Sequence, residues 1–347
     1  MNNWMIYGAN GYTGELIARE AKARGLNPVI AGRNASKINS LAKELNLPSE
    51  VFDLLDEQEV KRQLNNMQLV LNCAGPFSAT SQPMIKACIQ TGTHYLDITG
   101  EISVFEYAYQ QNLLAKAANI ILCPGVGFDV IPTDCLAAQL KKALPDAHYL
   151  VLGFDSNSSL SPGTAKTAVE GLAQGGKVRI DGKIKTLPLA WKTRRINFGR
   201  GEKLATTIPW GDISTAYYTT GIPNIEVYIP MPAKRVSMLK RVNYLRWLLG
   251  LKPIQNFLKK KAAQQQGPNA EALNGVTYVW GEVKNAKGES KTATITTANG
   301  YALTVEGSLA VVLHLLEHPE ESGYKTPSQL MGADFINKLT GSNKLKI

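Results

Sequence analysis

The sequence predicts an α/β protein with two lobes: an N-terminal, doubly wound parallel sheet and a second α+β domain that contains a mixed or antiparallel sheet. In the first 135 residues, short apolar runs alternate with longer stretches of helical apolar spacing, the pattern of parallel strands joined by crossover helices. After Pro132 the apolar runs are interrupted by Gly, Pro and Ser, which favours antiparallel strands. A chain of 347 residues is also too long for one comfortable hydrophobic core, so two lobes are expected.

Six strands and five crossover helices are expected in the first lobe. The strands are predicted at residues 4–7, 29–32, 51–52, 69–73, 95–98 and 120–123. The helices are predicted at residues 14–24, 35–45, 56–64, 81–90 and 102–118.

The second lobe carries the apolar runs 149–154, 222–229 and 276–283. Residues 277–282 and 292–297 flank a Gly-bearing loop, which predicts a hairpin. Residues 303–318 form an apolar helical stretch, and Pro327 suits the first turn of a final helix. The expected domains are 1–131, 132–301 and 302–347, with the helices of the last segment packing back on the first domain.

Composition excludes several classes of protein. Hydrophobic residues make up 44% and charged residues 19%, a globular balance rather than that of a disordered coil. The four cysteines show neither metal-ligand nor disulfide-framework spacing, so no metal site is predicted and a reduced, cytoplasmic location is expected. No apolar run reaches the roughly 18 residues needed to cross a bilayer.

A glycine-rich turn follows the first predicted strand and precedes the first helix. It reads Gly8-Ala9-Asn10-Gly11-Tyr12-Thr13-Gly14. The spacing allows a tight turn at Gly8, close approach of a pyrophosphate at Gly11 and helix–strand packing at Gly14, with the helix N-terminus facing the anion. The alternative is an ordinary glycine-rich turn. The order of strand, loop and helix favours a dinucleotide-binding Rossmann domain, in which Asn10, Tyr12 and Thr13 join the glycines at the site.

The end of the second strand indicates which dinucleotide is bound. The chain places Arg33 there, and no carboxylate stands at the position that would accept the ribose 2′-hydroxyl of NAD. A guanidinium can bind a 2′-phosphate bidentately, so NADP(H) is the predicted cofactor, with Asn34, Ser36 and Lys37 beside Arg33. A solvated arginine is the alternative. Asp53 is expected either to touch the adenine or to cap the helix that follows it.

Other enzymes that share this fold are disfavoured. None of the 13 tyrosines has a lysine four residues later, which short-chain dehydrogenases need to lower the phenol pKa. No Gly-x-Ser-x-Gly motif is present for a hydrolase. Cys135 lies on an apolar helical face, which favours a core thiol over a catalytic nucleophile.

Five motifs in one order resemble the saccharopine dehydrogenase-like oxidoreductases, in the branch that includes trans-acting enoyl reductases. They are residues 8–14, 31–33, 70–77, 95–101 and 124–134. Residues 267–268, 302–316 and 323–332 resemble further landmarks of the family, although an arginine expected shortly after Gly267-Pro268 is absent. The resemblance also implies that the loop after the fourth strand, with Cys73, Ala74, Gly75, Pro76 and Phe77, lies beside the cofactor.

The resemblance implies hydride transfer between the nicotinamide and a substrate. The first expectation is reduction of a C=C bond in a hydrophobic acyl chain on a lipid or carrier. The second is reduction of an amino-acid-derived imine, whose carboxylates could be bound by Arg194, Arg195 and Arg200. A third is a non-catalytic, NADP-binding protein of lipid surfaces.

Candidate proton donors follow the strand ends near the expected crevice: Glu101 and Asp129 first, then Tyr95 and Asp97. A carboxyl would need its pKa raised by burial to act as an acid near neutral pH. The alternatives are that Asp97 and Asp129 bind backbone N–H groups in turns, and that solvent protonates the product.

The net charge of +10 is concentrated in residues 234–261, which contain nine cations and no Asp or Glu. Met238, Val242, Leu245 and Leu249 recur there at helical spacing. This pattern predicts either a helix packed on its own domain or peripheral binding to anionic lipid or an acyl-carrying partner. Nucleic-acid binding is not predicted, because no aromatic-interleaved stacking motif is present. A homodimer is a further expectation.

Overall fold

The computed structural model describes residues 3–156, 169, 171–263, 275–318 and 320–347. Contacts divide the chain into two units: Met1–Ile131 with Tyr301–Met331, and Pro132–Gly300 with Gly332–Ile347. This division differs from the one expected from the sequence in the last segment, because residues from Gly332 onward belong to the second unit. Lys346 bonds to Thr294 through its backbone N–H and C=O, which ties the tail to that unit.

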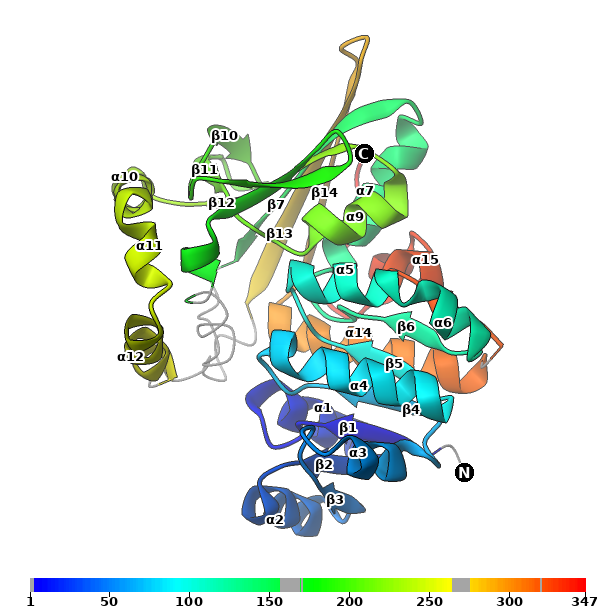
Figure 1. Cartoon of the computed structure of the whole chain (residues 1–347). Helices are drawn as coiled ribbons and strands as arrows, with labels where there is room; N and C mark the ends of the chain where they lie inside the picture. The colour runs from blue at the N-terminus through cyan, green and yellow to red at the C-terminus, as the bar shows by residue number, and fades with distance from the viewer. Residues whose placement is uncertain (1–2, 157–168, 170, 264–274, 319) are drawn as a thin grey trace. The chain divides into compact units, whose positions relative to one another are not determined.

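The first unit contains a seven-stranded parallel sheet in the order β15-β6-β5-β4-β1-β2-β3 (Figure 1). The strands are β1 (Trp4–Tyr7), β2 (Val29–Gly32), β3 (Ser49–Val51), β4 (Leu69–Asn72), β5 (His94–Asp97), β6 (Ile121–Cys123) and β15 (Gly323–Tyr324). Every residue of β1, β4 and β5 is buried, which is typical of a parallel sheet covered on both faces. The predicted doubly wound sheet is confirmed, and its strand order reverses between β1 and β4.

Helices of the first unit precede or follow these strands. They are α1 (Tyr12–Ala23), α2 (Ala35–Leu45), α3 (Glu57–Leu64), α4 (Phe77–Thr91), α5 (Ile102–Gln110), α6 (Asn112–Ala117), α14 (Gly300–Glu317) and α15 (Pro327–Met331). The single helix predicted at 102–118 is therefore wrong, since Gln111 separates α5 from α6. None of the helices that the structure describes is long and apolar enough to cross a membrane.

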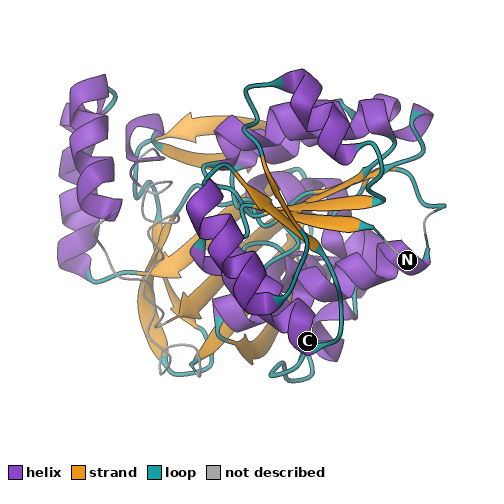
Figure 2. Ribbon diagram, turned by 90° about the horizontal axis from the view of Figure 1, so that it is seen from below, coloured by secondary structure: helices purple, strands orange, loops and turns teal. Residues whose placement is uncertain are grey.

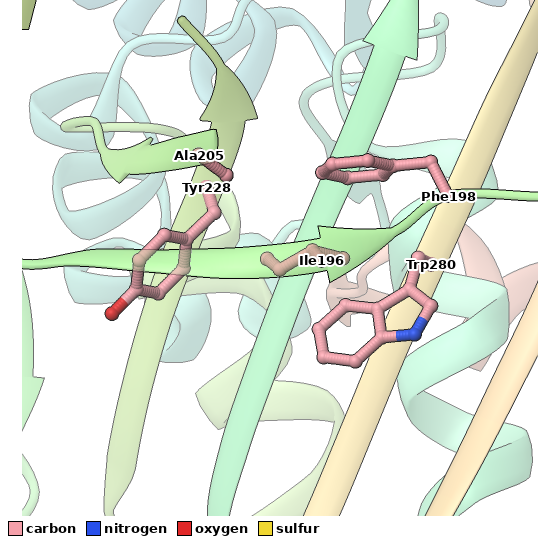
Figure 3. Packing of buried hydrophobic residues seen from close by; sticks show 5 residues of the cluster. All are labelled: Ile196, Phe198, Ala205, Tyr228 and Trp280. Atoms are coloured by element: carbon pink, nitrogen blue, oxygen red, sulfur yellow. The ribbon is translucent and has the colours of Figure 1, made fainter. Parts of the chain in front are cut away.

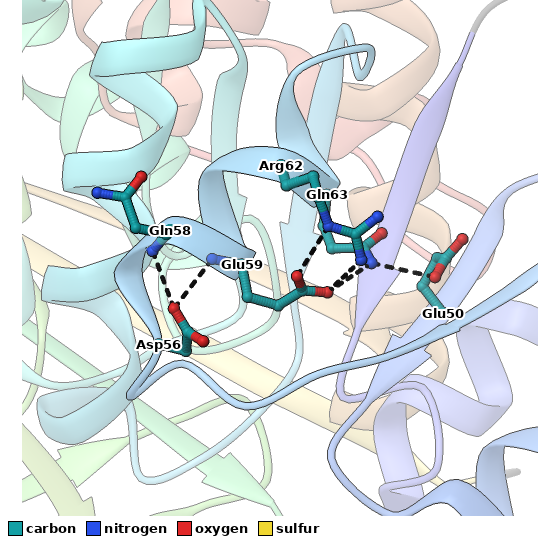
Figure 4. Close-up of polar contacts among 6 residues, drawn as sticks. All are labelled: Glu50, Asp56, Gln58, Glu59, Arg62 and Gln63. Atoms are coloured by element: carbon teal, nitrogen blue, oxygen red, sulfur yellow. Dashed lines mark hydrogen bonds and ion pairs between the residues drawn. The ribbon is translucent and has the colours of Figure 1, made fainter.

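Polar contacts fix α3 against the edge strand β3 (Figure 4). Asp56 caps the helix by accepting hydrogen bonds from the backbone N–H groups of Gln58 and Glu59. The amide of Gln63 donates to both Glu59 and Glu50, and Glu50 lies in β3. A short, largely exposed edge strand is thus held by side chains from the helix that follows it.

The second unit contains a mixed sheet whose main path runs β10-β11-β12-β7-β13-β14; off this path β8 pairs with β12, and β9 pairs with β8. The strands are β7 (Ala147–Ser156), β8 (Gly176–Ile180), β9 (Lys183–Leu187), β10 (Thr193–Asn197), β11 (Glu202–Thr207), β12 (Asn224–Pro230), β13 (Val276–Asn285) and β14 (Ser290–Ala298). The β12–β7 pair is parallel, and the other pairs are antiparallel. The predicted hairpin is β13–β14, so the predicted mixed α+β second domain is confirmed.

One face of this sheet receives α7 (Ile131–Ala143), since a Cβ at Gly281 would lie 2.2 Å from Leu136 of that helix. Side-chain hydrogen bonds join α7 to α9 (Asp212–Thr220) through the pairs Thr133–Asp212 and Thr219–Asp134. Figure 2 distinguishes the helices from the strands by colour. A cluster of buried hydrophobic residues in this unit, shown in Figure 3, consists of Ile196, Phe198, Ala205, Tyr228 and Trp280. Gly153 makes room for the Phe198 ring there, because a Cβ would lie 3.1 Å from it.

Candidate functional site

The turn after β1 is built for glycine at its first position. Gly8 has φ +81°, and its N–H donates to Ala31 O at 2.7 Å. A Cβ at Gly8 would lie 2.7 Å from the backbone nitrogen of Ala74. Any side chain would therefore strain the turn and push away the loop that follows β4.

The other two glycines of the motif, Gly14 and Gly11, lie in different surroundings: Gly14 is packed against the turn and Gly11 is open. A Cβ at Gly14 would lie 2.4 Å from Gly8 O, so Gly14 permits α1 to pack closely on the turn. Gly11 is exposed, and a Cβ there would meet only Gly8 O within 4 Å, at 3.3 Å. Gly11 is also the N-cap of α1 and supplies no side-chain cap. An open backbone at a helix N-terminus fits a diphosphate, which accepts hydrogen bonds from such N–H groups.

The remaining residues of the motif support the turn. Asn10 Oδ1 lies against Gly32, since a Cβ at Gly32 would be 2.8 Å from it. The Tyr12 ring packs edge-on against Tyr301 at 5.1 Å. Thr13 is half-buried in the first turn of α1. Gly32 was not predicted as a site residue. The sequence signal that could have indicated it is a glycine at the end of an apolar strand.

The start of α2 carries the residues predicted to recognise a 2′-phosphate. Asn34 is the N-cap, and its side chain accepts the N–H of Lys37 at 3.0 Å. Arg33, Ser36 and Lys37 are exposed at the same helix N-terminus. Two cationic side chains, a hydroxyl and a helix N-terminus together fit a phosphate monoester.

Asp53 and Arg33 follow the ends of the neighbouring strands β3 and β2. Burial raises the pKa of Tyr7 to about 12, with the Asp53 charge adding to the rise and the Arg33 charge opposing it. Asp53 also accepts the N–H of Leu55 at 3.0 Å, which stabilises the turn before α3. The helix itself is capped by Asp56 instead.

The loop after β4 is held by polar groups on both sides. Asn72, fully buried at the end of β4, accepts the N–H of Ala74 at 3.0 Å. Thr80 donates to Ala74 O at 2.6 Å.

Cys73 donates its N–H to Tyr7 O, and burial raises the pKa of its thiol. Gly75 is exposed in this loop, next to Pro76, which precedes α4. The role of Asn72 in holding this loop was not predicted from the sequence. The signal that could have indicated it is a polar residue at the end of a buried strand.

Glu101 anchors this loop from the next one along the sheet. Its two carboxylate oxygens accept the N–H groups of Phe77 and Ser78, each at 2.9 Å. Those are the first two residues of α4, whose own N-cap, Pro76, supplies no side-chain hydrogen bond. The Glu101 carboxylate therefore replaces the missing cap and complements the helix dipole. Its predicted catalytic role stays a prediction.

Tyr95 and Asp97 form a buried pair at the end of β5. Asp97 accepts the Tyr95 hydroxyl at 2.6 Å and the N–H groups of Thr99 and Gly125 at 3.0 and 2.8 Å. Burial raises the pKa of Asp97 to about 6, although these donors oppose the rise, and burial raises the pKa of Tyr95 well above its usual value. The geometry matches the turn-holding alternative for Asp97, joining the loops after β5 and β6.

Asp129 has a different environment. One oxygen of its carboxyl lies against Gly100, where a Cβ would be 2.8 Å away. Burial raises its pKa to about 7. A carboxyl that is partly protonated at neutral pH has the property that a general acid needs. Among the four predicted donors, Asp129 is the one whose chemistry suits proton transfer best.

The loops after β1, β4, β5 and β6 therefore form a continuous row in the first unit. Gly8 meets Ala74, Phe77 meets Glu101, and Asp97 meets Gly125. All four follow the carboxyl ends of parallel strands, the edge at which open α/β sheets bind ligands. Among the described residues, no group of three or more His, Cys, Asp and Glu side chains could hold a metal ion.

Of two further predictions, the one on Cys135 can be compared with the structure. Cys135 is fully buried, and burial raises its thiol pKa, in agreement with a core role. The Gly267-Pro268 landmark and the site of the absent arginine lie outside the described residues.

Replacing Arg33 with alanine should weaken NADPH binding by about 10-fold to 100-fold and leave NADH binding unchanged, because one charge-assisted contact to the 2′-phosphate is lost. Fluorescence titration with each dinucleotide measures this. Lys43→Ala is a matched control, since it removes one exposed positive charge from the far end of α2. Equal losses for the two dinucleotides in the Arg33 variant would contradict 2′-phosphate recognition.

Comparison with known proteins agrees with this geometry. Residues 4–121 match the family described as Saccharopine dehydrogenase NADP binding domain. The chain is 28% identical over 214 residues to a saccharopine dehydrogenase-like oxidoreductase of Bos taurus, covering 53% of this chain and 50% of that protein. It is 30% identical over 151 residues to a trans-acting enoyl reductase of Mycobacterium leprae, covering 40% and 35% respectively. The matched region thus spans about half the length of the first of these relatives.

A solved structure extends the likeness over the whole chain. The apo saccharopine dehydrogenase (L-Glu forming) of Saccharomyces cerevisiae superposes with a TM-score of 0.64 and covers 100% of this chain and 99% of its own. The sequence identity is 12%, so this likeness shows the fold alone.

Proposed function

We propose that the protein, whose residues 4–121 match the saccharopine dehydrogenase NADP-binding domain, is an oxidoreductase that reduces the C=C bond of a hydrophobic acyl substrate. The observation that carries the proposal is the placement of a dinucleotide cradle and a carboxyl of raised pKa, Asp129, on loops that follow strands of one parallel sheet. NADPH, when bound, supplies a hydride from its nicotinamide ring.

The residues that would hold the cofactor each have a defined contribution. The backbone around Gly11 binds the diphosphate, and Arg33, Ser36 and Lys37 bind the 2′-phosphate. The loop 73–77, fixed by Asn72 and Glu101, forms the wall next to the cradle through the contact between Gly8 and Ala74.

Reduction of a C=C bond also requires a proton. Asp129 supplies it from its carboxyl group, which burial keeps partly protonated near neutral pH. Gly100 leaves the space that this carboxyl occupies. Tyr95, Asp97 and Glu101 act as positioning residues, since each bonds groups that hold the surrounding loops in place.

Two observations favour an enoyl substrate over an amino-acid-derived imine. Arg194 is paired with Glu282 at 3.0 Å and Arg200 with Asp155 at 3.3 Å, so these guanidinium groups are already engaged by carboxylates of the chain. One relative is named trans-acting enoyl reductase. The match to it covers 40% of this chain and 35% of that protein.

A turnover screen tests the proposal. Purified protein is mixed with NADPH and either enoyl thioesters of increasing chain length or imines formed from a 2-oxo acid and an amino acid, and NADPH absorbance is followed. We expect oxidation with the enoyl thioesters, faster with longer chains. Turnover of imines alone would contradict the enoyl assignment. Tight NADPH binding without turnover of either class would favour the non-catalytic alternative.

A further inference from the structure

A helical segment of the second unit leaves many large apolar side chains exposed. It consists of α10 (Ala233–Val242), the short 3-10 helix η1 (Asn243–Leu245), α11 (Arg246–Leu249) and α12 (Lys252–Ala263). We call residues 233–261 of this segment the basic arm. Figure 1 shows its helices following one another in a column. Val236 is the one buried residue of α10, and η1 and α11 have none.

The exposed apolar residues are aromatic or long aliphatic side chains. Tyr244 is 84% exposed, Trp247 70% and Phe257 67%. Met238, Leu245 and Leu251 are also exposed. Single apolar residues on a surface need no explanation, but a run of them over successive helical turns marks an interaction surface. Trp and Tyr in particular favour the boundary between lipid headgroups and acyl chains.

The same arm is positively charged along its length. Its exposed cations are Lys234, Arg235, Lys240, Arg241, Lys252, Lys260 and Lys261. The sequence contains no Asp or Glu between residues 234 and 261. Within its own residues the arm therefore carries positive charge and no acid, and the complement of such a segment is an anionic surface.

Hydrogen bonds hold the arm on the rest of its unit. Asn243 accepts the N–H of Leu189 at 2.7 Å and donates to Leu189 O at 3.0 Å. Arg246 donates to Leu187 O at 3.4 Å, at the end of β9. A Cβ at Gly175 would lie 2.1 Å from the Arg246 guanidinium, so glycine leaves the space that this side chain occupies. Tyr244 and Trp247 are thus displayed from a fixed element of the fold.

We propose that the basic arm docks on the surface of an anionic lipid bilayer. The aromatic and aliphatic side chains enter the headgroup boundary, and the lysines and arginines bind lipid phosphates. The combination of exposed apolar residues with unrelieved positive charge favours this occupant over an acidic protein, which would account for the charge alone. The proposal does not depend on the hydride-transfer reaction.

Vesicle flotation of the full-length protein tests it. We expect co-flotation with vesicles of phosphatidylcholine and phosphatidylglycerol at about two to one, and little with phosphatidylcholine alone. Lys240→Glu/Arg241→Glu should reduce the bound fraction about tenfold or more, because each cation near the surface contributes to binding. Trp247→Ser should weaken binding at both low and high salt.

Matched variants separate docking from general effects. Lys287→Glu/Lys291→Glu makes the same change of net charge on the exposed tip of the β13–β14 hairpin, and Leu113→Ser removes an apolar side chain that is 77% exposed on α6. Both control variants should co-float with anionic vesicles to the same extent as the wild type. The melting temperature of every variant should equal that of the wild type. Equal flotation of the Lys240/Arg241 and Lys287/Lys291 variants would overturn the proposal. So would absence of flotation together with binding to an acidic acyl carrier protein, or with arm-dependent dimerisation.

Discussion

Replacing Gly8 with alanine should abolish measurable NADPH binding and lower the free energy of unfolding by about 3 kcal/mol or more. The substitution places a Cβ at φ +81° and 2.7 Å from the backbone nitrogen of Ala74. Left-handed backbone alone costs roughly 1–2 kcal/mol for a non-glycine residue. The remainder comes from displacing the loop after β4, which Asn72 and Thr80 hold in place. Chemical denaturation and fluorescence titration measure the two effects.

Gly25→Ala provides the matched control. Gly25 has a similar φ of +76°, but a Cβ there would meet nothing within 4 Å. This variant should lose only about 1 kcal/mol and bind NADPH normally. If the two variants are equally stable and bind equally well, the contact between the turn and the loop after β4 does not shape the cofactor site.

Elements of the first unit that depend on local signals could be predicted from the sequence. The bounds of β1, β2 and α2 match the predicted ranges to the residue. Short apolar runs ending at or before a glycine specify the two strands, and Asn34 and Asn46 at its two ends specify the helix. The edge strand β3 was misplaced by about two residues because Ser49–Val51 has no apolar run to identify it.

Elements that depend on distant partners could not be predicted. The two residues of β15 are too few to show a periodicity, and the strand exists because Gly323 donates to Ile120 O across the sheet edge. The start of α4 was predicted at residue 81 but lies at Phe77, since its cap is the side chain of Glu101 in another loop. Pro76 and Phe77 give no local capping signal.

The candidate site also contains residues whose roles could be predicted from local sequence and residues whose roles depend on distant partners. The glycine turn and Arg33 stand next to the strands that position them, so their roles could be inferred from spacing. The four candidate acids could be placed at strand ends, but their chemistry depends on which loops meet. Asp97 accepts hydrogen bonds from three donors and the Asp129 carboxyl lies against Gly100, and these positions follow from the folded structure alone.

Asp129→Asn should lower kcat for an enoyl substrate by about 100-fold, the lower range for loss of a general acid. In the wild type, kcat should fall as pH rises above about 7, because the proton on Asp129 is lost. The variant should lack this break. Measurement of kcat between pH 5 and 9 with saturating NADPH provides the profile. Glu101→Gln is the comparison: it disturbs the cap of α4 but should retain the break, since Asp129 is intact.

The Asp129 carboxyl should also affect the pH dependence of the free energy of unfolding, which can be measured without turnover. The pKa of Asp129 is about 7 in the folded protein against an ordinary value of 3.8, so folding favours its protonated form. Its contribution to stability is fully present below about pH 4 and is lost as pH rises through 7. Asp129→Asn removes that loss, so the variant should gain stability relative to the wild type, by on the order of 2 kcal/mol, between pH 4 and pH 8. Denaturation curves at the two pH values measure the difference. A kcat break without this stability difference would place the titrating group on another residue, whereas the two together assign the proton to Asp129.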